Sequence, residues 1–146
     1  MRQEQQFYKD ITVGLLTNFQ LLELSLKLYI GTSYDYIHIL VEDHVRFDFS
    51  ISDVENYPLE RLLTLFSKLN DNEELKKRLN KLRKERNYIA HEALLVTVGS
   101  NPNMDKLQKK SQDFFYLEDE LSECLKLVSE EFSKLKVKGE LSKLNA

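Results

Sequence analysis

Residues 75–96 read LKKRLNKLRKERNYIAHEALLV, and this stretch decides the fold class. Its apolar residues recur at spacings of three, four and seven, which is the pattern of an amphipathic α-helix. The stripe has one missing step, because Arg86 occupies the position between Leu82 and Ile89 where an apolar side chain is expected. We therefore predict a helix that carries an arginine in its apolar stripe. The stripe consists of Leu75, Leu79, Leu82, Ile89, Ala93 and Val96.

The same helical periodicity continues on both sides of this stretch. Upstream, it predicts a long first helix over residues 4–30 and a short one over residues 58–69, with Pro58 in its first turn. Downstream, Asn101-Pro102 is a start signal for a final helix whose stripe extends from Leu107 to Leu135. The chain is therefore predicted to be mainly α, a four-to-five-helix, up-and-down-like bundle that forms a single domain over residues 1–146.

The first helix carries apolar residues on two faces. A helix that is apolar on two sides often contacts more than its own core, so the second face predicts a dimer interface, with burial inside one chain as the alternative. Gly31 is predicted to end this helix in a left-handed conformation. The main stripe is Tyr8, Ile11, Leu15, Phe19, Leu22, Leu26 and Tyr29, and the second face is Leu16, Leu21, Leu24 and Leu28.

The segment that follows the first helix supports two interpretations. Alternation of apolar and polar residues from Val45 to Ile51 is typical of a β-strand, which could pair with residues 37–41 in a small hairpin around 36–51. The alternative is a helix through residues 34–43. His38 lies among apolar neighbours and is predicted to be packed and hydrogen-bonded.

Arg86 is the residue that needs an explanation. A guanidinium stays charged in a protein, so it requires an acceptor, water or an anionic ligand. The structural explanation is that Arg86 extends its charged end to solvent or pairs with a carboxylate such as Glu85 or Glu92. Asn87 and His91 share a helix face, whereas Arg86 and His91 point about 140° apart around an ideal helix. They could converge through the reach of the arginine, a local distortion, or a second copy of the helix in a symmetric dimer.

Arg86-Asn87 followed by His91, late in a helix of a small helical protein, resembles the arginine–polar–histidine signature of the HEPN superfamily (higher eukaryotes and prokaryotes nucleotide-binding). The resemblance spans roughly residues 7–136 in the order of helices, and it is close only at the motif. It implies a metal-independent endoribonuclease of toxin or phage-defence type that acts as a homodimer. Other superfamily members are non-catalytic modules that bind a nucleotide, RNA or a protein. Ala93 departs from a toxin branch that has tyrosine two residues after the histidine.

The motif residues suit RNA cleavage without a metal or a cofactor. RNA carries its own nucleophile in the 2′-hydroxyl, so an enzyme has to move protons and stabilise charge on the phosphate. His91 is the candidate acid–base group, because imidazole exchanges protons readily near neutral pH. Arg86 would bind phosphate oxygens, and Asn87 would orient His91 or hydrogen-bond the RNA. The expected products are a 2′,3′-cyclic phosphate and a 5′-hydroxyl.

Basic residues precede the histidine on the same predicted helix. Lys81, Arg83 and Lys84 are the candidate RNA-binding residues, and a dimer would bring two such runs together into a basic groove. The alternative is an ordinary solvated helix face. A formal net charge of −3 and a pI of about 5.7 argue against broad affinity for nucleic acid. Any RNA binding should therefore be local to the groove and sensitive to salt.

Other chemistry finds little support in the sequence. Three histidines and one cysteine show no metal-ligand spacing, and the four glycines are too scattered for a phosphate-binding loop. Cys124 lies between leucines on the final helix and is predicted to pack in the core. Neither a signal-peptide core nor a membrane-spanning segment is evident. We expect a cytoplasmic protein whose partners are RNA, a second copy of itself, and an antitoxin or regulatory protein.

Overall fold

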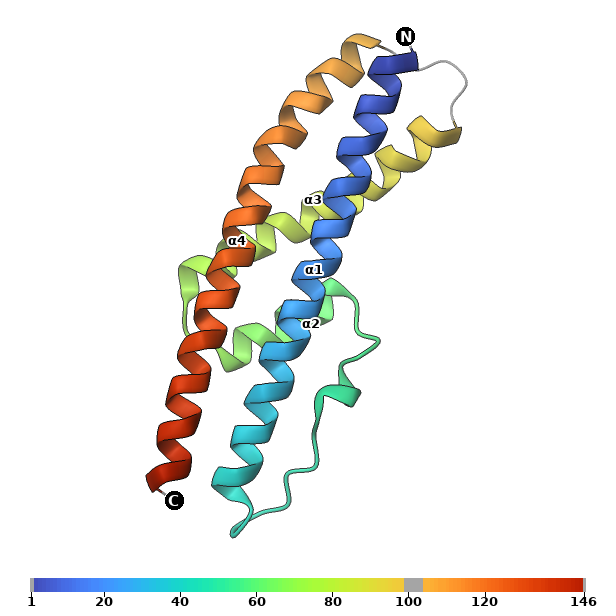
Figure 1. Cartoon of the computed structure of the whole chain (residues 1–146). Helices are drawn as coiled ribbons and strands as arrows, with labels where there is room; N and C mark the ends of the chain where they lie inside the picture. The colour runs from blue at the N-terminus through green and yellow to red at the C-terminus, as the bar shows by residue number, and fades with distance from the viewer. Residues whose placement is uncertain (1, 99–103, 146) are drawn as a thin grey trace.

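The computed structural model describes residues 2–98 and 104–145, and within them the chain is almost entirely helical. Two long helices lie side by side and run in the same direction, and α3 crosses behind both of them at an oblique angle (Figure 1). The predicted mainly α class is therefore confirmed. The elements are α1 (Arg2–Val41), the 3-10 helix η1 (Ile51–Asp53), α2 (Leu59–Leu69), α3 (Glu73–Val98) and α4 (Met104–Asn145).

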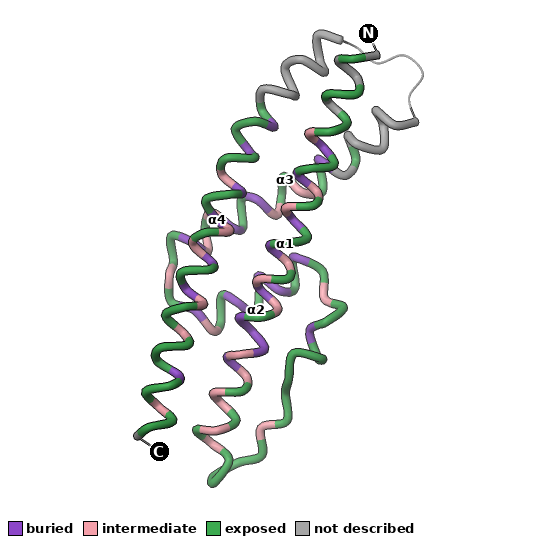
Figure 2. The backbone as a smooth tube through the Cα atoms, in the orientation of Figure 1, coloured by how far each residue is buried: buried purple, intermediate pink, exposed green. Residues whose placement is uncertain are grey.

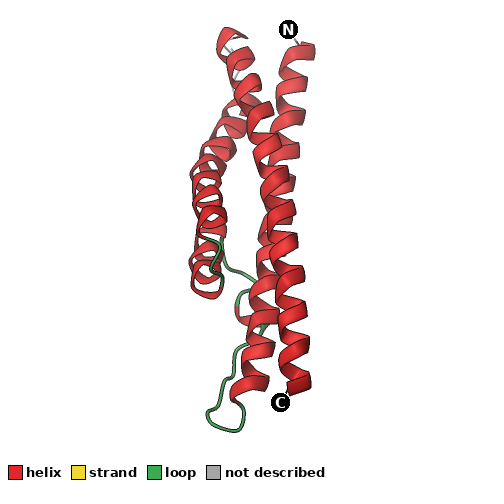
Figure 3. Ribbon diagram, turned by 90° about the vertical axis from the view of Figure 1, so that its left-hand side faces the viewer, coloured by secondary structure: helices red, strands yellow, loops and turns green. Residues whose placement is uncertain are grey.

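The helices form two layers. Seen from the side, the long helices α1 and α4 make one layer, and the α2–α3 segment packs against it (Figure 3). α1 is the central element, because it contacts α2, α3, α4 and η1. Buried residues gather in the middle of the molecule, where these helices meet (Figure 2). Phe66 of α2 is fully buried there, with its ring 4.9 Å from that of Tyr29 in an edge-on contact.

The predicted apolar stripes form this core. On α3, Leu75, Leu79, Leu82 and Ile89 are at most 1% exposed, whereas the side chains of Ala93 and Val96 lie outside the described residues. The start signal Asn101-Pro102 and the side chain of Leu107 also lie outside them. The helix periodicity therefore identified the buried faces wherever they are described. Further buried stripe residues are Leu15, Phe19, Leu22, Leu26 and Tyr29 of α1, and Phe114, Leu117, Leu121 and Val128 of α4.

The end of α1 was predicted wrongly. The helix continues through Gly31 to Val41, and no described glycine has a positive φ. Gly31 instead allows a close approach, since a Cβ added there would lie 2.7 Å from the Cβ of Ile51 in η1. The glycine therefore makes room for the chain that returns along α1, and it does not terminate the helix.

The hairpin around residues 36–51 does not form, and the alternative helix through residues 34–43 is the correct interpretation up to Val41. Residues 46–50 have neither helix nor strand, and they run beside α1 (Figure 1). The rings of Phe47 and Phe49 each lie 5.8 Å from that of Tyr34, which explains the alternation of apolar residues. His38 is hydrogen-bonded as predicted, because its Nδ1 lies 3.0 Å from the carbonyl oxygen of Phe47. Its side chain is exposed, so the prediction that it is packed was wrong.

A polar network fixes the linker between α2 and α3. Asn70 is buried, and its Nδ2 donates to the hydroxyl of Tyr29 at 3.0 Å. Asn72 caps α3 by accepting the N–H of Leu75 at 3.1 Å, and its Nδ2 donates to the buried carboxylate of Glu131 at 2.7 Å. Burial raises the pKa of Tyr29. The network joins α1, the linker and α4, and so sets where α3 begins.

The second apolar face of α1 remains partly uncovered. Leu21, Leu24 and Leu28 are 48%, 52% and 43% exposed, so burial inside one chain does not account for them. Leu16 is half-buried against the core. Across the described parts of the chain, no helix is long and apolar enough to cross a membrane.

Candidate functional site

Arg86 lies on the side of α3 that faces α1. Its Nε is 3.3 Å from Oε1 of Glu23 in α1, and the two side chains are 36% and 17% exposed. Nε is buried without a partner in hydrogen-bond geometry, so the contact is an ion pair and not an aligned hydrogen bond. The sequence predicted a carboxylate partner such as Glu85 or Glu92; the partner is a carboxylate, but it comes from α1.

His91 and Asn87 point to the opposite side of α3. Both are exposed, and within the described chain no hydrogen bond or ion pair engages either side chain. The angular separation of about 140° between Arg86 and His91 persists, because α3 is a regular helix across the motif. One chain therefore does not bring Arg86 and His91 to a common point.

The three candidate RNA-binding residues do not share one surface. Arg83 faces α2, and its Nη1 donates to Oε1 of Glu60 at 2.9 Å. Lys84 is exposed on the outer side of α3. Lys81 is exposed on the side of α3 that faces α4, where it lines a groove. Lys84 is thus the member of the three that lies nearest to the exposed face of Asn87 and His91.

Carboxylates balance much of the basic run on α3. Arg78 donates from Nε to Oε1 of Glu120 at 2.7 Å, and this hydrogen bond is the largest cause that lowers the pKa of Glu120. The same bond raises the pKa of Arg78. Lys76 pairs with Glu73 at 2.9 Å. Local neutralisation of this kind fits the chain's slightly negative net charge and restricts the surface available to attract phosphates.

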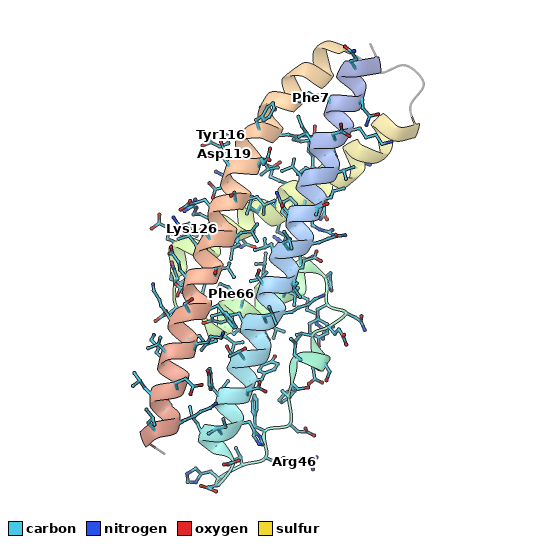
Figure 4. The ribbon with its side chains drawn as sticks, viewed as in Figure 1. Phe7, Arg46, Phe66, Tyr116, Asp119 and Lys126 are labelled. Atoms are coloured by element: carbon cyan, nitrogen blue, oxygen red, sulfur yellow. The ribbon has the colours of Figure 1, made fainter. Side chains whose placement is uncertain are left out.

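A groove of about 420 Å³ lies between α3 and α4. Its aromatic wall includes Tyr88 and Tyr116, the latter 79% exposed and labelled in Figure 4. Carboxylates outnumber cations along its lining, so the groove disfavours a phosphate ligand. The acidic members are Glu85, Asp113 and Glu120, and the basic members are Arg78 and Lys81.

The remaining tests for a site are the metal ligands and the similarity to known proteins. Among the side chains that the structure describes, no group of three or more His, Cys, Asp or Glu residues is placed to hold a metal ion. Comparison of the chain with protein-family models, curated proteins and solved structures found no match. The argument for function therefore rests on the motif residues and their surroundings.

Sequence reasoning missed Glu23. The residue lies between Leu22 and Leu24 in the middle of α1, and it is the charged residue of the stretch 11–26. That charge was a signal, but its connection with Arg86 requires the packing of α1 on α3. The contact comes from residues far apart in the sequence, so no local pattern contains it.

Proposed function

We propose that the chain is a metal-independent endoribonuclease of the HEPN type, acting as a homodimer in a toxin or phage-defence role. The observation that carries the proposal is the setting of Arg86. It occupies a core-facing position between two buried residues, Leu82 and Ile89, where an apolar side chain would pack better. Yet the side chain remains 36% exposed, so a ligand can reach it from solvent.

Glu23 supports this role by orienting Arg86. The ion pair involves Nε, so the two terminal nitrogens of the guanidinium are left to bind phosphate oxygens in a bidentate manner. Glu23 is thus a positioning residue, and Arg86 is the group that would contact the scissile phosphate. The developing negative charge on that phosphate would be stabilised by a preorganised cation.

His91 would carry the proton transfers. It removes the proton from the 2′-hydroxyl of RNA as that oxygen attacks the adjacent phosphorus, and the bond from phosphorus to the 5′ oxygen breaks. The departing 5′ oxygen takes a proton from water and His91 releases its own proton to water, which leaves a 2′,3′-cyclic phosphate and a 5′-hydroxyl. Asn87 lies one turn before His91 and is exposed on the same face, where it would orient His91 or hydrogen-bond the RNA.

The divergence of Arg86 and His91 on α3 favours a site shared between two copies. A symmetric dimer would place His91 of one copy opposite Arg86 of the other and would form two equivalent sites. The exposed leucines of α1 are consistent with such a dimer, because apolar side chains that stay uncovered in one chain are typical of an interface. RNA, a second copy, and an antitoxin or regulatory protein are the proposed partners.

Incubation of the purified protein with labelled single-stranded RNA in EDTA tests this function. Wild type should cleave and leave cyclic-phosphate ends, and Arg86→Ala and His91→Ala should each lower the rate by about 10²-fold or more. Lys77→Ala is the matched control on the exposed side of α3 and should retain activity. Cleavage that persists in both motif variants, or that requires Mg²⁺ and yields 3′-hydroxyl ends, would contradict the proposal.

The alternative is a non-catalytic HEPN-like module that binds a nucleotide, RNA or a protein. It is favoured by one observation: no described residue orients His91, and catalytic histidines commonly have such a partner. In that case Arg83→Ala, Lys84→Ala and Arg86→Ala would weaken RNA binding, and His91→Ala would leave it unchanged. Titration of labelled RNA at several salt concentrations distinguishes the two functions, because loss of a phosphate contact also lowers the salt dependence.

A further inference from the structure

Residues 45–49 follow the turn that ends α1 and run beside it without helix or strand, and all of them except the half-buried Phe47 are exposed (Figure 1). Val45 and Phe49 are 59% and 55% exposed, and Arg46 and Asp48 are exposed as well. The segment follows α1 and lies along the outside of the bundle, where Arg46 is labelled in Figure 4. Apolar and polar side chains alternate along it, as they do in a β-strand, but no described strand is paired with it.

The two edges of this segment are not equivalent. The carbonyl oxygen of Phe47 lies 3.0 Å from Nδ1 of His38, so this main-chain group faces α1. The N–H of Val45 bonds to the carbonyl oxygen of Val41 in the turn that ends α1. Main-chain groups alternate in direction along an extended chain, so those of Arg46 and Asp48 point to the other edge. No hydrogen bond within the described chain engages them.

The side chains on this free edge are complementary to themselves. Arg46 and Asp48 form an ion pair of 3.1 Å on one face of the segment, and they are 87% and 79% exposed. In an antiparallel pair with a two-fold axis at Phe47, Arg46 lies opposite Asp48 of the second copy, and Asp48 lies opposite its Arg46. An axis at residue 46 or 48 would instead place like charges opposite each other, which is unfavourable.

We propose that residues 45–49 pair with the same segment of a second copy of this chain as an antiparallel, two-stranded ribbon centred on Phe47. Arg46 and Asp48 would then exchange main-chain hydrogen bonds with Asp48 and Arg46 of the second copy. An isolated two-stranded ribbon is only marginally stable in water. Here each strand is backed by α1, because the rings of Phe47 and Phe49 pack on Tyr34.

This contact does not depend on the proposed ribonuclease function. It uses none of the motif residues of α3, and it is a contact between copies whether or not the chain cleaves RNA. If the chain also dimerises through α1 and α3, the ribbon adds a second two-fold contact. Two such contacts on one chain generate a closed tetramer or an open chain of dimers.

Charge variants test the register directly. Asp48→Arg would place arginine opposite Arg46 of the second copy, and Arg46→Asp would place aspartate opposite its Asp48. Each variant should therefore weaken self-association at this contact by about tenfold or more. The double variant Arg46→Asp/Asp48→Arg should restore it. An equimolar mixture of the two single variants should also associate, because every opposed pair is then of opposite charge. Sedimentation equilibrium measures the three variants and the mixture, with Glu130→Arg at an exposed position of α4 as the control that matches the charge change of Asp48→Arg.

Disulfide cross-linking isolates this contact from any other dimer interface. The proposed register places Val45 opposite Phe49 of the second copy as a non-hydrogen-bonded pair, with Cα atoms about 4.5 Å apart, which a disulfide can bridge. Oxidation of a mixture of Val45→Cys and Phe49→Cys proteins should give a cross-linked heterodimer. Neither variant should cross-link alone, because residue 45 is far from residue 45 of the other copy.

Three results would overturn the proposal. The first is absence of the mixed cross-link at protein concentrations where wild type self-associates. The second is wild-type protein that stays monomeric at the highest concentration tested. The third is equal association of the single charge variants, the double variant and the Glu130→Arg control.

Discussion

The ion pair between Arg86 and Glu23 holds the guanidinium end of the long and flexible Arg86 side chain. Ordering such a side chain costs conformational entropy, so a catalytic arginine benefits from a partner that orders it before the ligand binds. The partner must not occupy the terminal nitrogens, and Glu23 satisfies this because it contacts Nε. At the residue scale, the account therefore assigns orientation to Glu23 and phosphate binding to Arg86.

Substitution of Glu23 should show whether this residue orients Arg86 for RNA cleavage or only stabilises the fold. The contact is an ion pair, so Glu23→Gln, which removes the charge but keeps the size of the side chain, should lower RNA cleavage as Glu23→Ala does, and both should retain more activity than Arg86→Ala. Steady-state cleavage assays give kcat and KM for the three variants, and thermal unfolding shows whether each is folded. Equal loss in all three variants with unchanged stability would contradict the division of roles.

Cys124 should be unreactive toward thiol reagents in the folded protein. Its side chain is fully buried, and burial together with the neighbouring Glu120 raises the pKa of the thiol to about 12. At pH 8 a thiol reagent should therefore label native Cys124 at least about a thousandfold more slowly than an exposed cysteine. Lys126→Cys in a Cys124→Ala background is the exposed comparison (Figure 4). Rapid labelling of native wild type would show that the core opens at this point.

The ion pair between Arg78 and Glu120 should appear in the pH dependence of stability. The pKa of Glu120 is lowered in the folded state, so its contribution is present above the ordinary value of 4.5 and is lost as the pH falls through the lowered value. The free energy of unfolding should therefore fall less steeply below pH 4.5 in Glu120→Gln than in wild type. Urea unfolding at several pH values measures this slope. Equal slopes in the two proteins would contradict a contribution of this ion pair to stability.

At the scale of elements, helix periodicity predicted α3, α2 and the apolar stripes of α1 and α4, because each stripe reflects burial along one helix. The same reasoning failed beyond Gly31. An alternating segment such as residues 45–51 has one side against a neighbour and one side in solvent, whether that neighbour is a strand or a helix. Only the packing of Phe47 and Phe49 on α1 decides between these, and that contact is not a local property of the sequence.

The two glycines within α1 provide a matched test of this packing. Both substitutions to alanine bring the same gain in helix propensity, about 0.5–1 kcal/mol. A Cβ at Gly14 meets nothing within 4 Å, whereas one at Gly31 would press on Ile51. Gly14→Ala should therefore stabilise the protein, and Gly31→Ala should be less stable than Gly14→Ala by about 1–3 kcal/mol. Chemical unfolding measures both, and equal stability would show that η1 does not pack on α1.

At the scale of the whole molecule, the helical bundle could be predicted, but the arrangement of the site could not. The misfit of an arginine between Leu82 and Ile89 identified Arg86, and helical geometry predicted that His91 would point away from it. The structure adds that Arg86 faces α1 and that the basic residues near it are divided among different sides of α3. These facts depend on how the helices pack, and local sequence does not encode packing between distant helices.

A site shared between two copies requires Arg86 from one chain and His91 from the other, so a mixture of the two inactive variants should regain activity. Arg86→Ala and His91→Ala proteins, unfolded together and refolded as an equimolar mixture, should form heterodimers in which one site contains both native residues. RNA cleavage in EDTA should then recover to about a quarter of the wild-type rate, since half of the dimers carry one intact site of two. No recovery, with heterodimers confirmed by mass spectrometry and wild type active, would contradict the shared site.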